Sequence, residues 1–275
     1  MTARADTHGA GSEQPRLPRL VLVAHGTRDP EGQKTIGRLV EAVRARLPEV
    51  DVALAWVDVI GPEPSEILAD GVPSVLVPAF LGHGYHVGHD LPEAMRTAPG
   101  PVVVTEHLGV VDEVVEALAD RLREAGWKAP GPGPGPAEQN RPSGRGRAVV
   151  LAGAGSSSDR AVAEARSVGA ALAQRLGVTV IPGFAVTAEP SVPDAVRQAS
   201  TEGDDVAIST YLLAPGFFAD RVRMQSVDAD ETGVPASEGP ASGDRSPLVV
   251  SNPIGVHPAI VDLLVRRYRE APRLP

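Results

Sequence analysis

The sequence predicts an α/β protein of two tandem, similar domains, each a four-stranded parallel sheet flanked by helices. Three observations predict it. Apolar, β-branched runs alternate with segments of helical periodicity, the second half of the chain repeats the first, and a Pro/Gly-rich segment separates the halves. Such a flavodoxin-like, doubly wound sheet binds ligands beyond the carboxyl ends of its strands. We therefore expect an active cleft between the two domains, at those ends.

The first predicted domain spans residues 19–127. Its four predicted strands lie in the runs RLVLVA, VDVALAWVDVI, SVLVPAF and PVVV, which read as buried parallel strands because their apolar residues are continuous rather than alternating. After the first strand, Asp29 is a good N-cap and Pro30 suits the first helical position. Gly126 ends the closing helix, VDEVVEALADRLREAG.

The remaining segments follow from composition. Residues 1–18 are polar and rich in helix breakers, so we expect a disordered leader. Residues 128–147, KAPGPGPGPAEQNRPSGRGR, cannot form a core and predict a linker. Residues 148–270 predict a second, degenerate domain. Within it, the acidic, Gly/Ser/Pro-rich stretch 227–246 predicts a disordered insertion.

The repeat is informative because it is incomplete. Ala154-Gly155 falls where His25-Gly26 stands in the first half, and Phe218 falls where His86 stands. The second copy keeps the glycines and apolar strands but lacks both strand-end histidines. Only the first domain is therefore expected to hold a metal.

Composition excludes several classes of function. A formal charge of -9 disfavours nucleic acid as a partner, because such binding depends on clustered Lys and Arg. The chain has no cysteine, which excludes disulfides and thiolate metal sites. It has neither a long apolar run nor the apolar core of a signal peptide near its start, so we expect a cytoplasmic protein that does not bind membranes.

Two histidines carry the chemical hypothesis. His25 follows the first strand and His86 follows the third, and these strands are commonly neighbours in a doubly wound sheet. Adjacent strands lie about 4.8 Å apart, so the two imidazoles could share one divalent ion. His83 and His89 are interpreted as loop histidines that could also pass metal inward or contact substrate. His257 is expected in the first turn of the last helix.

Other residues could complete this site. Glu106-His107 follows the fourth strand, so either side chain could be a further ligand. Gly82, Gly84 and Gly88 surround His86, and their lack of side chains would let a flat, bulky ligand approach the backbone. Turn geometry alone explains these glycines equally well.

These residues resemble a known family. VAHGTRDPEGQ is similar to the His-Gly-Ser-Arg opening of the class II chelatases, and VPAFLGHGYHVGHDLP resembles their Pro-x-Phe-Leu-x-x-Gly-x-His-x-x-x-Asp-Ile-Pro segment. The chain looks like a sirohydrochlorin chelatase in the long form that fuses two copies. The resemblance implies that His25 and His86 bind the incoming metal and help to take protons from the pyrrole nitrogens. The metal is then a substrate, and no cofactor is permanently bound.

The resemblance also implies contacts with the tetrapyrrole. Sirohydrochlorin carries many carboxylates, so the cleft should supply cations. The expected substrate-binding residues are Arg28, Gly84, Tyr85 and Arg221, with Arg96, Arg160 and Arg223 as further candidate cations. Thr27 replaces the usual Ser of the motif, and Asp58 stands where the family often has Glu. The identity of an assisting carboxylate therefore stays open among Asp58, Glu63 and Glu106.

The implied activity is that of a lyase, a metal chelatase that inserts Fe²⁺, for siroheme, or Co²⁺, for cobalamin, with a slight preference for iron. One alternative is a non-catalytic metal or tetrapyrrole carrier on the same scaffold. A histidine-phosphatase-like enzyme is disfavoured, because that chemistry places Arg before the His-Gly pair and here Ala24 precedes it. Because the two halves imitate a dimer, we expect a monomer.

Overall fold

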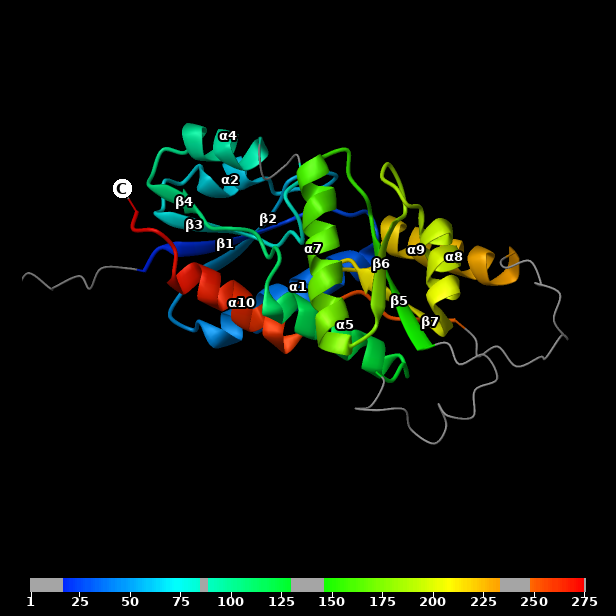
Figure 1. Ribbon diagram of the computed structural model, residues 1–275. Helices are drawn as coiled ribbons and strands as arrows, with labels where there is room; N and C mark the ends of the chain where they lie inside the picture. Colours follow the sequence, from blue (N-terminus) through cyan, green and yellow to red (C-terminus); the bar gives the residue numbers. More distant parts are fainter. Residues whose placement is uncertain (1–16, 85–88, 130–145, 233–247, 275) are drawn as a thin grey trace, which may run out of the picture.

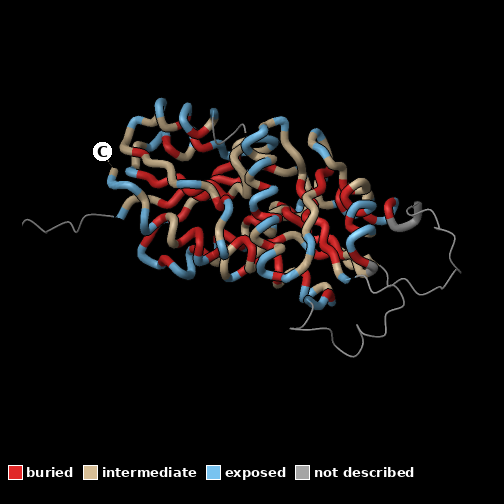
Figure 2. The backbone as a smooth tube through the Cα atoms, in the orientation of Figure 1, coloured by how far each residue is buried: buried red, intermediate tan, exposed pale blue. Residues whose placement is uncertain are grey.

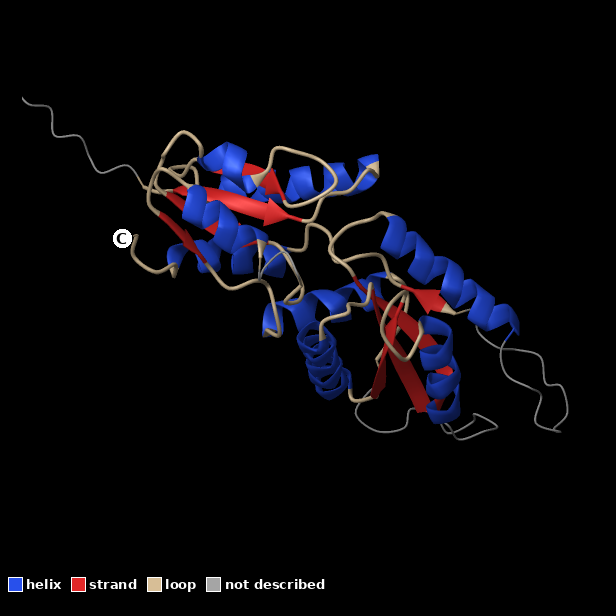
Figure 3. Ribbon diagram, turned by 90° about the horizontal axis from the view of Figure 1, so that it is seen from above, coloured by secondary structure: helices blue, strands red, loops and turns tan. Residues whose placement is uncertain are grey.

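The computed structural model describes residues 17–84, 89–129, 146–232 and 248–274. In these residues the chain forms two four-stranded parallel sheets, with strand orders β2-β1-β3-β4 and β6-β5-β7-β8. Figure 3 shows the two sheets in separate lobes with helices on both faces. The predicted fold class, two tandem and similar α/β units, is confirmed.

Strands and helices alternate along both halves (Figure 1). The first half contains β1 (Arg19–Ala24), α1 (Pro30–Arg46), β2 (Val52–Trp56), α2 (Pro64–Leu68), β3 (Ser74–Pro78), α4 (Asp90–Thr97), β4 (Val102–Val104) and α5 (Asp112–Glu124). The second half contains β5 (Gly146–Gly153), α7 (Asp159–Leu176), β6 (Thr179–Phe184), α8 (Val192–Glu202), β7 (Gly203–Tyr211), α9 (Phe217–Thr232), β8 (Val249–Val250) and α10 (Pro258–Arg269).

Local chemistry explains where the helices begin. The Asp29 side chain accepts hydrogen bonds from the backbone N–H groups of Glu31 and Gly32, and Pro30 occupies the first turn of α1, as the sequence predicts. Ser158 caps α7 in the corresponding place. The central strands β1 and β5 are almost entirely buried because helices cover both faces of each sheet.

The last helix of each half packs on the other half. α5 contacts α7 and β7 of the second half, whereas α10 contacts α1 and β3 of the first. The buried side chains of α1, α5, α7 and α10 form one continuous core with faces of both sheets, and each sheet has a separate core on its other face. Figure 2 shows buried residues running through both lobes. The halves therefore share a core rather than each closing its own.

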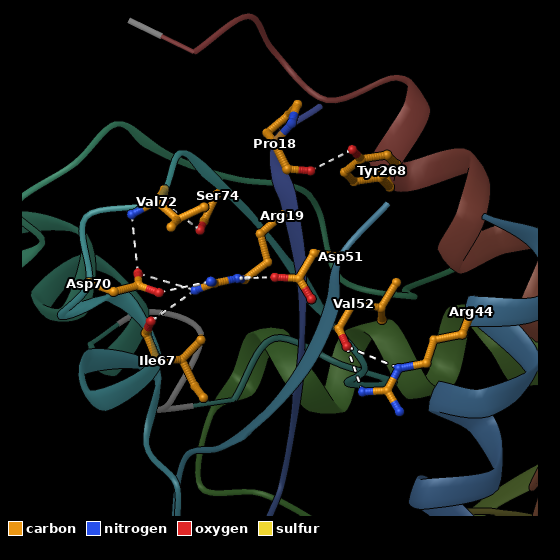
Figure 4. A network of polar contacts seen from close by, with 10 residues as sticks. All are labelled: Pro18, Arg19, Arg44, Asp51, Val52, Ile67, Asp70, Val72, Ser74 and Tyr268. Atoms are coloured by element: carbon orange, nitrogen blue, oxygen red, sulfur yellow. Dashed lines mark hydrogen bonds and ion pairs between the residues drawn. The ribbon is translucent and has the colours of Figure 1, made fainter. Parts of the chain in front are cut away.

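A polar network at the amino edge of the first sheet also joins α10 to the residue that precedes β1 (Figure 4). The Arg19 guanidinium donates to the carboxylates of Asp51 and Asp70 and to the carbonyl of Ile67. Next to it, the Tyr268 hydroxyl of α10 donates to the Pro18 carbonyl, at 2.6 Å. This network lies at the opposite edge from the predicted site and has a structural role.

Two elements differ from the sequence-based expectations. The predicted second strand ran to Ile60, but β2 ends at Trp56, because the next residues turn sharply with Val59 at a φ of 69°. The insertion expected to be disordered from residue 227 instead begins as helix. α9 continues to Thr232, and Ala229 is buried against the second sheet. Residues 1–16, 130–145 and 233–247, which contain most of the leader, the linker and the rest of the insertion, lie outside the described residues.

Candidate active site

His25 directly follows β1, and its side chain reaches the solvent. The glycine after it has a steric reason. A Cβ at Gly26 would lie 1.7 Å from the carbonyl oxygen of Asp58, so any side chain there would displace the turn after β2. That turn is closed by a hydrogen bond from the Ile60 N–H to the same carbonyl, at 2.7 Å. Gly26 thus lets the backbone after β1 pack against the turn after β2, while the His25 imidazole stays exposed.

The exit of β5 repeats this arrangement without the imidazole. A Cβ at Gly155 would lie 1.9 Å from the Val186 carbonyl oxygen, and the Ala188 N–H donates to that carbonyl at 2.7 Å. Thr187 has a φ of 66°, close to the 69° of Val59 in the matching turn. The predicted equivalence of Ala154-Gly155 and His25-Gly26 is therefore confirmed, and the second edge has lost only its side-chain chemistry.

The exit of β3 is described only in part. β1 pairs with β3, as predicted, so the chain beyond each strand emerges at the same edge. Leu81, Gly82, His83 and Gly84 follow β3, and a Cβ at Gly84 would meet no atom of the described residues within 4 Å. Tyr85 and His86, the predicted substrate contact and second metal ligand, lie outside the described residues. That Tyr85 and His86 share a site with His25 stays a prediction.

The edges of the two halves meet beside His25. A Cβ at Gly216 would lie 3.2 Å from the Thr27 hydroxyl oxygen, and a Cβ at Gly32 would lie 2.6 Å from the Pro215 carbonyl oxygen. The loop between β7 and α9 therefore packs on the loop that carries His25. The aromatic ring of Phe217 follows this loop and is 65% exposed.

A second contact joins the edges around Glu164 of α7. Its carboxylate accepts a hydrogen bond from the His83 N–H at 2.7 Å and one from Arg160 at 3.2 Å, and it lies 3.6 Å from His107 Nε2. The rings of His83 and His107 are 6.0 Å apart. In a single sequence nothing distinguishes Glu164 from a solvated helix residue, so sequence reasoning missed it.

Burial affects the charge of His107 in this cluster. It lowers the pKa of the His107 imidazole, and the nearby Glu164 carboxylate acts in the opposite direction. The neutral ring is thus favoured, although its Nδ1 has no hydrogen-bond partner among the described residues. Within the described part of the chain, no three His, Asp or Glu side chains are grouped to hold a metal ion. Among those residues, His107 lies beside His83 and Glu164.

The candidate cations have different surroundings. Arg28 is exposed on the His25 loop, and Arg223 is exposed on α9. Arg221 donates through Nε to the Ala185 carbonyl at 3.0 Å, which fixes it beside the carboxyl end of β6. Arg160 pairs with Glu164, as described above, and Arg96 pairs with Glu93 on α4 at 2.5 Å.

The candidate carboxylates are also separated. Asp58 lies in the turn that packs on Gly26, where its side chain accepts from the Val59 N–H. Glu63 is exposed and caps α2 together with Glu66. Glu106 is exposed and pairs with Arg267 of α10 at 3.0 Å. Of the three, Asp58 has backbone contact with the His25 loop.

His257 is a structural residue. It caps α10 from the position just before the helix, where Nδ1 accepts from the Ala259 N–H at 3.2 Å. Its Nε2 lies 3.2 Å from the Asp120 carboxylate of α5. The sequence placed it in the first turn, one position too late. His89 is exposed beside Asp90, with 3.2 Å between Nδ1 and Oδ1.

Comparison with known proteins agrees with this geometry. The model of the CbiX family matches residues 19–125 and again residues 148–271, so one family unit covers each half. The chain belongs to the CbiX family. Two curated relatives are named sirohydrochlorin cobaltochelatase. The one from Methanothermobacter thermautotrophicus is 27% identical over 139 residues, which cover 42% of this chain and 96% of the relative. The one from Methanopyrus kandleri is 24% identical over 136 residues, or 38% and 95% of the two chains.

Solved structures show the same fold. SirB from Bacillus subtilis with Fe³⁺ has a TM-score of 0.71 at 22% identity, covering 92% of this chain and 95% of that one. SirB from Bacillus subtilis subspecies spizizenii in complex with cobalt has a TM-score of 0.68 at 19% identity, with the same coverage. Both structures thus share the fold of this chain along nearly its whole length. No helix in the described residues is long and apolar enough to cross a membrane.

Proposed function

We propose that this CbiX-family protein is a sirohydrochlorin chelatase that inserts a divalent metal, Fe²⁺ or Co²⁺, into the tetrapyrrole. The observation that carries the proposal is the family match over both halves, together with an exposed His25 at the sheet edge where the halves meet. The relatives' names supply the substrate class. No observation favours the carrier alternative.

In the proposed reaction the metal is a substrate and leaves in the product. The free tetrapyrrole gives up two pyrrole N–H protons and gains one M²⁺, so the charges balance when both protons reach bases. His25 and His86 are proposed to bind the metal through neutral imidazole nitrogens. Once an imidazole has released the ion to the ring, its nitrogen is free to accept a pyrrole proton, because an imidazole titrates near neutral pH. A site with open coordination positions releases its ion more readily than a closed four-ligand site.

The substrate is proposed to lie at the junction of the two halves. Arg28 extends from the His25 loop and Arg221 from α9, so carboxylates of a flat ring placed between them would meet a cation from each half. None of the described residues fills the space where a Gly84 side chain would lie, and Gly84 and Tyr85 are proposed to contact the ring. We also propose that residues 19–127 and 148–270 form the two domains, and that the sheet of each domain forms one wall of the substrate-binding cleft.

Anaerobic incubation of the purified protein with sirohydrochlorin and either Fe²⁺ or Co²⁺, followed by absorbance, tests the activity. We expect metal insertion faster than in a protein-free blank, and the ratio of kcat/KM for the two ions identifies the preferred metal. If neither ion is inserted faster than in the blank, the proposal is wrong.

We further propose that the protein acts in the cytoplasm as a monomer. The shared core already joins two family units within one chain, as a dimer of single-unit subunits would. Light scattering on the purified protein should give the mass of one chain. A stable dimer would contradict the monomer proposal.

A further inference from the structure

Two hydrogen bonds run from the second half to the segment that follows β3. The Tyr211 hydroxyl donates to the Leu81 carbonyl at 2.7 Å, and the Glu164 carboxylate accepts from the His83 N–H at 2.7 Å. Tyr211 is 7% exposed and the Glu164 side chain 17%, so water competes weakly for either bond. Burial and the nearby Glu164 carboxylate raise the pKa of the Tyr211 phenol, which keeps its hydroxyl protonated as a donor.

Among the described residues, the positions of the first half that are equivalent to Tyr211 and Glu164 do not form these two bonds. Because Ala154 corresponds to His25, the strand registers make Tyr211 equivalent to Ala79, which has no hydroxyl. Glu164 is the sixth residue of α7 and is equivalent to Thr35, the sixth residue of α1. The Thr35 hydroxyl donates to the Glu31 carbonyl of its own helix. The half that lost its strand-end histidines thus carries polar groups that hold the other half.

We propose that Glu164 is a positioning residue for the exit of β3, and that Tyr211 supports it. This inference rests on the proposed function, because the segment Leu81–Gly84 leads in sequence to His86, a proposed metal ligand. The Glu164 carboxylate accepts from the His83 N–H and lies beside His107, so the second half holds the backbone of the described residues that precede His86 in the sequence. A charge-assisted hydrogen bond in partly buried surroundings suits this role.

The expected effect is on metal affinity rather than on folding. Loss of residues that orient metal ligands lowers metal affinity by about 10-fold to 100-fold. We expect Glu164→Ala to weaken Co²⁺ binding to this extent in calorimetry with Co²⁺ alone. Glu164→Gln keeps an oxygen that accepts the His83 N–H, so its affinity should recover toward that of the wild type. Tyr211→Phe, which removes only the bond to Leu81, should weaken binding in the same direction.

A matched control separates positioning from general interface damage. Arg46 of α1 and Asp262 of α10 also form an ion pair between the halves, but both are exposed and lie on other elements. Asp262→Asn should leave Co²⁺ affinity unchanged. The inference is wrong if Glu164→Ala and Tyr211→Phe both bind Co²⁺ like the wild type, or if Asp262→Asn loses as much affinity.

The outcome is also distinguishable from failure of the proposed function. Binding of Co²⁺ is measured without tetrapyrrole, and His25→Ala identifies the part of that binding that belongs to the proposed site. If the wild type binds Co²⁺ but does not insert it, the chelatase proposal fails and the positioning test still stands. If insertion occurs and Glu164→Ala changes neither Co²⁺ affinity nor the KM for metal, only the positioning inference fails.

Discussion

The carboxyl ends of β1 and β5 have similar backbone packing and different chemistry. Both continue into a glycine that packs against a carbonyl oxygen, and both face a tight turn with one residue in the left-handed region. The first edge presents His25, whereas the second presents Ala154. Backbone packing is therefore similar at an edge that lacks the imidazole, where the shared core and the joined edges constrain its shape.

The comparison also shows what the second half contributes. Its strand β7 packs against α5, and its helix α10 packs on β3 of the first sheet. Its residues Glu164 and Tyr211 form hydrogen bonds with the segment that follows β3. The helices and polar side chains of the second half thus contact the first half directly. Substitutions in each half should separate these contributions.

The largest effect is expected from removing an imidazole from the first edge. His25→Ala should lower kcat/KM for metal insertion by about 10²- to 10⁴-fold, the usual contribution of a positioned acid or base. His86→Ala should lower it to a similar degree. Ala154→Ser, at the equivalent position of the second edge, is the control and should leave the rate unchanged. Equal losses at both edges would mean that the second half also takes part in the chemistry.

Unfolding should show that the two halves are one cooperative unit. Ile208 is fully buried in the separate core of the second sheet, so Ile208→Ala should lower the free energy of unfolding by about 2–5 kcal/mol. Both tryptophans, Trp56 and Trp127, are buried in the first half. Their fluorescence should nevertheless report the same lowered midpoint as circular dichroism of the whole chain. An unchanged tryptophan midpoint would show that the halves unfold independently.

The two turn glycines should separate stability from function. Gly26→Ala and Gly155→Ala each place a Cβ against a carbonyl oxygen, and overpacking of this kind costs about 1–3 kcal/mol. We expect both to lower the midpoint of thermal unfolding, Gly155→Ala more strongly because Gly155 has a φ of 95°. Only Gly26→Ala should also weaken Co²⁺ binding, since it displaces the backbone of His25. If Gly155→Ala weakens binding equally, the effect is not local.

The smallest effect concerns His107. Burial lowers its pKa in the folded state below the value of about 6.5 found in unfolded chains. As the pH falls below that value, the unfolded state binds more protons than the folded state, and stability is lost. His107→Asn, which does not titrate, should therefore lose less thermal stability than the wild type between about pH 7.5 and pH 5.5. Parallel losses in the two proteins would show that His107 is not the titrating group.

The sequence by itself determined the α/β architecture, the duplication, and the location of His25 at the end of a strand. These features follow from local rules: apolar periodicity identifies strands and helices, Asp29-Pro30 starts α1, and a glycine permits close backbone contact. Local composition misjudged residues 227–232, because burial of Ala229 on the second sheet extends α9 into a segment that looks disordered.

Only the tertiary structure decided how the halves depend on each other. The sequences of α5 and α10 do not indicate that each helix packs on the opposite half, because an apolar stripe packs equally well on either sheet. Leu81 and Tyr211 are 130 positions apart, and His83 and Glu164 are 81 apart. No periodic pattern connects residues at such separations. Their contact depends on the packing of two complete sheets, and a lone sequence does not contain that information in local form.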